Sequence, residues 1–129
     1  MRLLLDTNAL IWWIDDSPRI RQQARAVITD PDNELYVSAA SAWEIAIKVG
    51  LGKLAAPADV QRWLPAALED QRFTPMAISV SHATGVEALP PHHRDPFDRL
   101  LIAQATAEGL SIVTGDQVFE RYGVPVIRC

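Results

Sequence analysis

The chain alternates between short apolar runs, which are typical of buried strands, and longer segments whose apolar residues recur at helical spacing. The strand-like runs are residues 2–6, 34–37, 74–78, 110–113 and 124–127. The helical patterns are residues 7–14, 18–28, 39–49, 58–71, 79–89 and 96–108, with a short helix between the last two strands. Strands alternating with helices predict a parallel sheet covered by helices on both faces. The expected fold class is therefore α/β.

Several predicted helices begin or end at residues that favour such ends. Ser17 followed by Pro18 is a good start for the second helix, with serine as N-cap and proline at the first helical position. Ser38 can cap the next helix, and Gly109 can end the last long one. Pro65 falls inside a helical pattern, where it lacks the N–H that the helix needs, so we expect a bend there.

With 129 residues, 49% of them hydrophobic, the chain is long enough for one domain, residues 1–129, and too short for a second. Its longest apolar stretches, such as residues 9–14 and 100–103, are far shorter than the roughly 20 residues that a membrane span needs. No secretory signal is expected at the N-terminus. The lone Cys129 cannot form an internal disulfide, which agrees with a reducing compartment. We expect a cytoplasmic protein.

The formal net charge of -4, from 12 basic and 16 acidic residues, argues at first against a nucleic-acid partner, which usually requires a basic surface. The distribution of charge matters more than the sum. If four of the carboxylates hold metal ions, the charges of the remaining acids equal those of the 12 basic residues. The bound cations then offset the negative charge of the four metal-binding carboxylates. A polyanionic substrate is then compatible with the composition.

Four acids fall where ligands bind in open parallel sheets, outside the carboxyl ends of the strands. Asp6 ends the first strand, and Asp116 follows the segment 110–114. Asp98 lies in the first turn of its helix, and Glu44 lies in the helix after the second strand. We therefore expect all four side chains near one edge of the sheet.

Each acid also has a purely structural interpretation. Asp6 and Asp116 could cap the helices that follow them, which is the commoner role for either acid taken singly. Asp98 could complement the dipole of its helix. Glu44 could pair with Lys48 one turn later.

The surroundings of Asp98 and Glu44 favour a shared metal site. Asp98 lies on the same helical stripe as Leu101 and Ile102, which indicates that it points inward. Glu44 lies in a helix that is apolar nearly all round. Because buried carboxylates repel one another, a divalent cation would resolve the conflict. Mg²⁺ and Mn²⁺ prefer carboxylate oxygens, and the chain lacks the cysteine and histidine spacing of a zinc site, so we expect one or two Mg²⁺ or Mn²⁺ ions.

Four segments of the chain carry a recognisable pattern. They are Leu4-Leu5-Asp6-Thr7-Asn8, Ser41-Ala42-Trp43-Glu44-Ile45-Ala46-Ile47-Lys48, His93-Arg94-Asp95-Pro96-Phe97-Asp98-Arg99-Leu100-Leu101-Ile102-Ala103-Gln104-Ala105 and Thr114-Gly115-Asp116. Together and in this order they resemble the PIN domain, specifically the VapC-like toxins of bacterial toxin–antitoxin pairs. The resemblance implies a three-layer α/β/α sandwich with a central parallel sheet. The family's acidic quartet matches Asp6, Glu44, Asp98 and Asp116.

The resemblance further implies a metal-dependent endoribonuclease that forms a homodimer and is inhibited by a cognate antitoxin whose tail enters the active site. In the expected reaction, ions held by the quartet activate a water for in-line attack on an RNA phosphodiester and stabilise the departing 3′ oxygen. Asp6 and Asp98 are the expected direct ligands, while Glu44 and Asp116 bind directly or through water.

Other side chains near these motifs could also contribute. Asn8 and Thr114 could hydrogen-bond a ligand or a metal-bound water, although Asn8 could equally shape a helix start. His93 lies in a loop that could touch phosphate or the antitoxin, and a solvated loop tip is an equally good interpretation. Trp43 could stack on unpaired bases, but core or dimer packing is the safer interpretation. Arg99 could contact phosphate or belong to a solvated surface.

Two other functions remain open. A receiver-like phosphoacceptor domain is also α/β and of similar length, but it needs an aspartate after its third strand and a lysine after its fifth. Here the third predicted strand ends in Ile78-Ser79, and no lysine follows Lys53. The other alternative is a non-catalytic RNA- or protein-binding module on the same fold. Loss of a quartet acid would favour that module, and none is lost.

Overall fold

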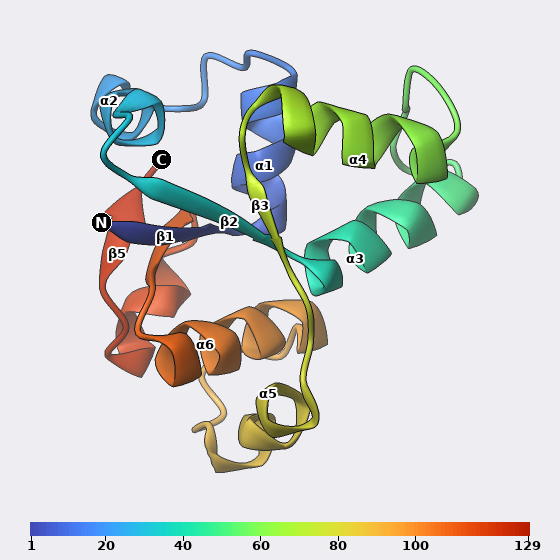
Figure 1. Ribbon diagram of the computed structural model, residues 1–129. Helices are drawn as coiled ribbons and strands as arrows, with labels where there is room; N and C mark the ends of the chain where they lie inside the picture. The colour runs from blue at the N-terminus through green and yellow to red at the C-terminus, as the bar shows by residue number, and fades with distance from the viewer.

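A computed structural model describes residues 1–129, in which five parallel strands form one sheet in the order β3-β2-β1-β4-β5. The strands are β1 (Arg2–Leu5), β2 (Glu34–Ser38), β3 (Thr74–Met76), β4 (Ser111–Thr114) and β5 (Val126–Arg128). Because β1 is central, the residue that follows it emerges between the ends of β2 and β4 (Figure 1). Both chain termini lie on the same side of the molecule.

Alternate side chains of each strand pack on opposite faces of the sheet, as the two-residue period of a strand requires. In β1, Leu3 and Leu5 belong to one apolar cluster and Leu4 belongs to a second. In β4, Val113 joins the first cluster and Ile112 joins the second. Since all five side chains are buried, both faces of the sheet need a covering layer of helices.

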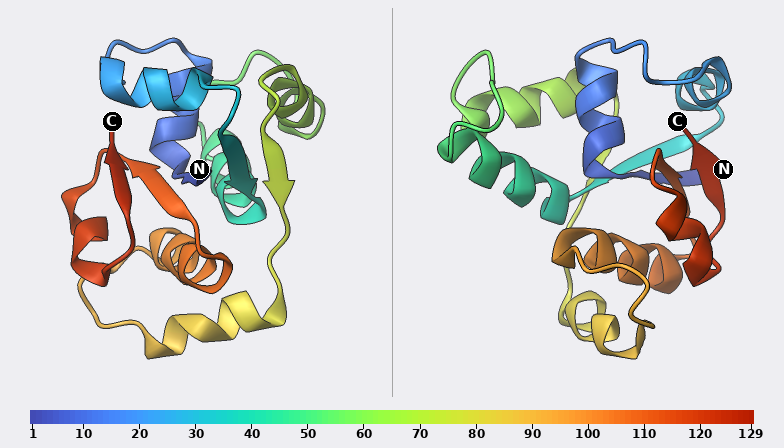
Figure 2. Two further views of the ribbon diagram at one scale, coloured as in Figure 1. Left: turned by 60° about the vertical axis from the view of Figure 1, so that its left-hand side comes forward. Right: turned by 180° about the vertical axis from the view of Figure 1, so that it is seen from behind.

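The helices supply those two layers. They are α1 (Thr7–Ile14), α2 (Gln22–Thr29), α3 (Ala39–Gly50), α4 (Val60–Asp70), α5 (Val80–Gly85) and α6 (Pro96–Glu108), with short 3₁₀ helices at Val86–Ala88 and Gln117–Tyr122. Figures 1 and 2 show α1, α2 and α4 on one side of the sheet and α5 and α6 on the other, while α3 contacts α1, α4 and α6. The predicted three-layer sandwich around a parallel sheet is therefore confirmed.

The predicted start of the second helix is wrong. We expected residues 18–28, but α2 begins at Gln22. The N–H of Ser17 donates to the carbonyl of Trp12, and the guanidinium of Arg25 donates to the carbonyl of Ser17. These contacts tie the segment to α1 in a turn, so tertiary packing overrides the local helix-start signal.

Three other boundaries differ from the prediction. The strand expected at 74–78 ends at Met76, because the Ala77 carbonyl accepts a hydrogen bond from the Gln104 side chain. The helix expected at 79–89 leaves the α-helical form after Gly85 and continues as a 3₁₀ turn. The last strand starts later than expected, since Pro125 has no N–H for the sheet. Helix α4 remains one helix through Pro65.

The strand order excludes the receiver-like alternative. In that fold the first strand lies between the second and the third, whereas here β1 lies between β2 and β4. No helix combines the length and the hydropathy of a membrane-spanning segment.

Candidate metal centre

The strand register brings two of the four acids to the same edge of the sheet. Leu5 at the end of β1 pairs with Val113 of β4, so the chain leaves both strands at one level. Asp6 follows β1 directly, and its backbone N–H donates to the Val113 carbonyl at 3.0 Å. Asp116 lies two residues after Thr114, the last residue of β4. The two acids therefore lie beyond the carboxyl ends of neighbouring strands.

Asp6 is buried and uses both carboxylate oxygens. Its Oδ1 caps α1 by accepting from the N–H of Ala9 at 2.7 Å, and its Oδ2 accepts from Oγ1 of Thr114 at 2.5 Å. Thr114 is fully buried, and its Oγ1 also accepts from the N–H of Asp116 at 3.0 Å. Thr114 thus links the two acids. The side chain of Asn8 is exposed and makes no hydrogen bond to them.

Asp116 combines a capping bond with a contact in the site. Its Oδ1 accepts from the N–H of Val118 at 2.9 Å, which caps the 3₁₀ helix Gln117–Tyr122. Its Oδ2 lies 2.9 Å from Nε2 of His93 in hydrogen-bonding geometry. Because a carboxylate has two oxygens, capping and site roles are compatible in both Asp6 and Asp116.

Glu44 carries a buried oxygen without a partner. Ser38, the last residue of β2, caps α3 by accepting from the N–H of Ala40, so α3 starts directly at the sheet edge. Glu44 in this helix is only 8% exposed. Its Oε2 pairs with Nζ of Lys48 at 3.0 Å, but its Oε1 is buried and accepts no hydrogen bond. Since buried polar atoms are nearly always satisfied, this oxygen is available to bind a cation or a water.

Asp98 faces a histidine that the sequence did not identify as part of the site. Asp95 caps α6 by accepting from the N–H groups of Phe97 and Asp98, so the Asp98 carboxylate is not used for capping. Oδ2 of Asp98 lies 3.0 Å from Nε2 of His93. The solvated-tip interpretation of His93 is wrong, because its side chain is only 16% exposed and lies between Asp98 and Asp116. A sequence signal was present: His93 stands two residues before an N-cap aspartate, close to the helix start.

Burial and mutual repulsion make two carboxyls weaker acids. Burial, the largest cause, raises the pKa of Asp6 from 3.8 to about 6, and the charges of Asp116 and Glu44 add to the rise, while the hydrogen bonds that Asp6 accepts oppose it. Burial also raises the pKa of Asp98 from 3.8 to about 7; neighbouring acids add to the rise and His93 opposes it. The neighbouring acids are thus close enough to destabilise the charged forms of Asp6 and Asp98.

This donor set fits a divalent cation. Ligand atoms of His93, Asp98 and Asp116 all lie within 4.8 Å of one another. Glu44 supplies a buried oxygen without a partner, and burial, with the charges of neighbouring acids, raises the pKa values of Asp6 and Asp98. Carboxylate oxygens are the ligands that Mg²⁺ and Mn²⁺ prefer. A bound cation would satisfy Glu44 Oε1 and offset the repulsion.

Two side chains near the acids have surroundings that the sequence did not predict. Trp43 is 60% exposed and meets Phe97 edge-on with ring centroids 5.2 Å apart, so the core-packing interpretation is wrong, while dimer packing and stacking on bases stay predictions. Arg99 is not a freely solvated charge. Its guanidinium donates to main-chain carbonyls of the segment that precedes α6, namely those of Val86, Leu89, Pro90 and His93.

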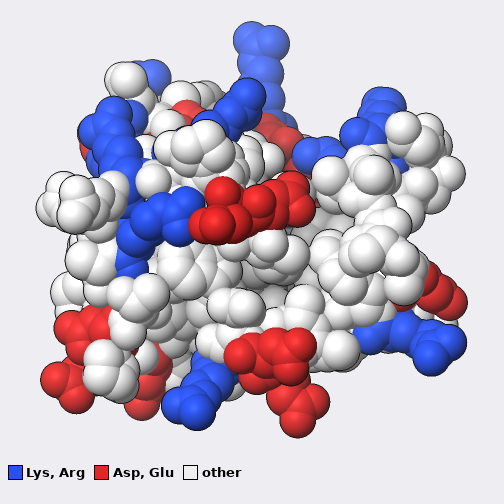
Figure 3. Space-filling view, turned by 90° about the horizontal axis from the view of Figure 1, so that it is seen from above, with Lys and Arg blue, Asp and Glu red and all other residues white.

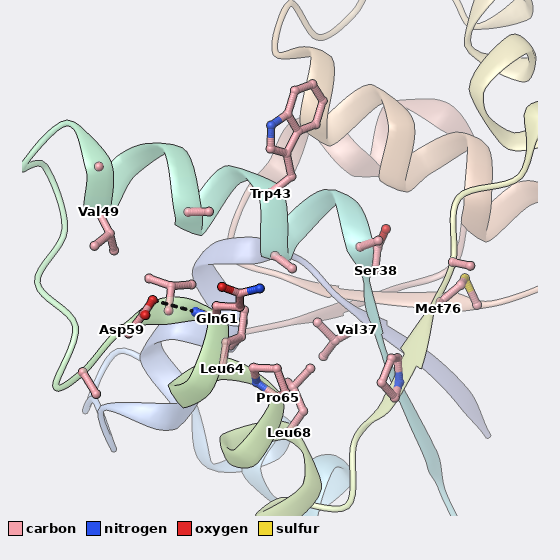
Figure 4. A pocket seen from close by; sticks show the side chains of 18 residues that line it. Val37, Ser38, Trp43, Val49, Asp59, Gln61, Leu64, Pro65, Leu68 and Met76 are labelled. Carbon is pink, nitrogen blue, oxygen red and sulfur yellow. Dashed lines mark hydrogen bonds between the residues drawn. The ribbon is translucent and has the colours of Figure 1, made fainter.

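An apolar groove of about 990 Å³ lies beside α3, between that helix, α4 and β3. Figure 4 shows Val49 of α3, Leu64 of α4 and Met76 of β3 around it. Elsewhere the surface is mixed: on the face in Figure 3, basic and acidic side chains alternate with uncharged surface and form no broad basic patch.

Comparison with known proteins agrees with this architecture. The profile of the PIN domain matches residues 3–125. The chain is 32% identical over 115 residues to ribonuclease VapC22 of Mycobacterium tuberculosis, covering 89% of this chain and 87% of the relative.

Solved structures share the fold at lower identity. A chain of VapBC2 from Rickettsia felis, bound to a DNA fragment from its promoter, superposes with a TM-score of 0.74 at 18% identity, covering 100% of this chain and 99% of that one. A chain of a toxin–antitoxin complex from Klebsiella pneumoniae gives 0.61 at 23% identity, covering 97% and 95%. With a family match over nearly its whole length and this acidic edge, the chain belongs to the PIN domain family.

Proposed function

We propose that this chain is a metal-dependent endoribonuclease and the toxin of a toxin–antitoxin pair. The observation that carries the proposal is the buried Oε1 of Glu44, which has no hydrogen-bond partner in a cluster of carboxylates. A bound cation would give that oxygen a partner and would offset the burial and repulsion that raise the pKa values of Asp6 and Asp98. The name ribonuclease, carried by the relative from M. tuberculosis, supports RNA as the substrate.

The proposed ligands of one or two Mg²⁺ or Mn²⁺ ions are Asp6, Glu44, Asp98 and Asp116. Oε1 of Glu44 and Oδ1 of Asp98 accept no hydrogen bond, so they are the oxygens most available for direct binding. Both oxygens of Asp6 and Asp116 already accept hydrogen bonds and bind through a remaining lone pair or a water. When bound, such an ion lowers the pKa of a water molecule and stabilises charge on the phosphate and the leaving oxygen.

The chain's own groups hold these carboxylates in place. Thr114 donates to Asp6, and Lys48 pairs with one oxygen of Glu44 while leaving the other free. These contacts fix the direction of each carboxylate before a substrate arrives, which is the arrangement that a preorganised site requires.

The proposal includes a cognate antitoxin, a homodimer and action in the cytoplasm. The antitoxin is supported by the toxin–antitoxin complex among the structural relatives. Trp43 and Ile47 of α3, with Leu51 directly after it, form an exposed apolar stripe next to the groove, and such patches mark surfaces that another chain covers.

RNA cleavage by the purified chain tests the enzymatic part. Single-stranded RNA is incubated with Mg²⁺, with EDTA, and with the Asp98→Asn variant. We expect cleavage by the wild type with Mg²⁺ and none in the other two reactions. Asp32→Asn, which changes an exposed loop acid in the same way, is the matched control and should cleave normally. Undiminished cleavage with EDTA or by Asp98→Asn would refute the metal mechanism.

Induced expression in growing bacteria tests the toxin part. The wild-type chain should arrest growth, whereas Asp98→Asn, produced at the same level, should not. Equal growth of both cultures would contradict a toxin function without affecting the ribonuclease assignment.

A further inference from the structure

His93 does not belong to the acidic quartet, but several contacts fix both its main chain and its ring. Its backbone N–H donates to the hydroxyl of Tyr122 at 2.7 Å, and its carbonyl accepts from the Arg99 guanidinium at 3.3 Å. Its ring meets Phe119 edge-on, with centroids 5.8 Å apart. Main chain and ring are thus anchored at three points, two of them in the 3₁₀ helix Gln117–Tyr122 and one in α6.

A fourth contact decides which ring nitrogen carries the proton. The backbone N–H of Asp95 donates to Nδ1 at 3.1 Å, so Nδ1 is an acceptor. In a neutral imidazole the proton is then on Nε2. That nitrogen donates to Oδ2 of Asp116 at 2.9 Å and lies 3.0 Å from Oδ2 of Asp98. His93 therefore donates its one Nε2 proton to Asp116 and lies beside the Asp98 carboxylate.

We propose that His93 is a positioning residue of the metal centre, which holds the Asp116 carboxylate by a hydrogen bond, lies against the Asp98 carboxylate and is not itself a metal ligand. The inference rests on the proposed function, because it concerns the same site. Oδ2 of Asp98 is the oxygen that faces His93, and Oδ1 accepts no hydrogen bond, so the contact leaves one oxygen for a cation. Donors behind ligating carboxylates are a common way to fix such ligands.

Direct ligation by His93 conflicts with its surroundings. Binding through Nε2 would move the ring proton to Nδ1, where it would face the N–H of Asp95 across 3.1 Å. Two N–H groups would then oppose each other in a half-buried loop, and Asp116 Oδ2 would lose its donor. The observed arrangement avoids both costs.

Binding of Mn²⁺ alone, in the absence of RNA, tests this role. The free Mn²⁺ signal in electron paramagnetic resonance gives Kd for the wild type, His93→Leu and His93→Gln. Leucine removes the donor, and we expect Kd to rise by about 10–100-fold. Glutamine places an amide N–H near the Nε2 position and should restore Kd to within about 3-fold of wild type. His92→Gln, at the neighbouring histidine, is the matched control and should bind as the wild type does.

Pulsed electron paramagnetic resonance of Mn²⁺ bound to the wild-type protein needs no variant. The result therefore does not depend on whether His93→Leu folds. We expect no coupling from a directly bound ¹⁴N nucleus. Directly bound nitrogen, or an unchanged Kd for folded His93→Leu, would overturn the positioning role while leaving the ribonuclease proposal intact. A wild-type chain that binds no Mn²⁺ would instead contradict the proposed function, and this inference with it.

Discussion

At the scale of single residues, Asp6 and Asp116 combine two roles that the sequence presents as rivals. Each uses one oxygen to cap a following helix and directs the other at a neighbour in the site. Glu44 does the same with Lys48, since one oxygen forms the ion pair and the other has no partner. The structural and the metal interpretations of these acids therefore describe different atoms of the same side chains.

Thr114 should be necessary for this arrangement. Thr114→Val keeps the shape of the side chain but removes the donor to Asp6 and the acceptor for the Asp116 N–H, both buried. We expect the free energy of unfolding in urea to fall by about 1–3 kcal/mol, with reduced RNA cleavage. Thr106→Val is the control, because the hydroxyl of exposed Thr106 bonds only within its own helix. Equal losses in the two variants would contradict the role of Thr114.

At the scale of elements, local signals predicted helices well where no distant contact opposed them. Asp95 and Gly109 mark the first and last turns of α6 in both sequence and structure. The Ser17-Pro18 signal failed because Arg25 and Trp12 hold that segment in a turn. These contacts are close in sequence, but they depend on how α1 and α2 are placed relative to each other, which the helix-start signal at Ser17-Pro18 does not encode.

The end of α6 gives a test at this scale. Gly109 has a φ of +67°, a conformation that other residues adopt only with strain. Gly109→Ala should lower the free energy of unfolding by about 1–2 kcal/mol. Gly50→Ala, at the end of α3 where φ is not positive and no atom lies within 4 Å of the added methyl, should not lower it. Urea titrations compare the two variants, and equal losses would show that backbone strain is not the cause.

At the scale of the whole molecule, the acidic edge should make the fold less stable near neutral pH when no cation is present. Folded Asp6 and Asp98 keep their protons up to about pH 6 and 7, while the unfolded chain releases them near 3.8. Between these values the folded state binds more protons, so the free energy of unfolding falls as pH rises and levels off above about pH 7. Thermal unfolding in EDTA across this range should show a falling Tm.

Two further comparisons isolate the cause of that fall. Mg²⁺ should raise Tm more at about pH 7.5 than at about pH 5, because ionised carboxylates bind the cation and protonated ones do not. Asp98→Asn should flatten the pH dependence in EDTA and raise Tm near neutral pH, since it removes a buried charge. A Tm that rises with pH over this range would contradict the repulsion at the site.

The sequence predicted the parallel sheet and the edge at which the four acids lie, because strand ends and helix starts follow from local pattern. It did not predict the place of His93, whose ring is fixed by Phe119 and whose main chain is held by Tyr122 and Arg99. Those partners come from the last helix of the sandwich and from the 3₁₀ helix after β4. Only the assembled fold brings them together.

The most direct test of the central claim is the rate of RNA cleavage by Glu44→Gln as Mg²⁺ is varied. The amide keeps the size of the side chain but replaces the negative charge that would bind a cation. We expect cleavage to fall by about 100-fold or more, with part of the loss recovered at high Mg²⁺. Glu69→Gln, an exposed change on α4, should cleave at the wild-type rate. A Glu44→Gln variant that cleaves RNA as fast as the wild type at every Mg²⁺ concentration would contradict the claim.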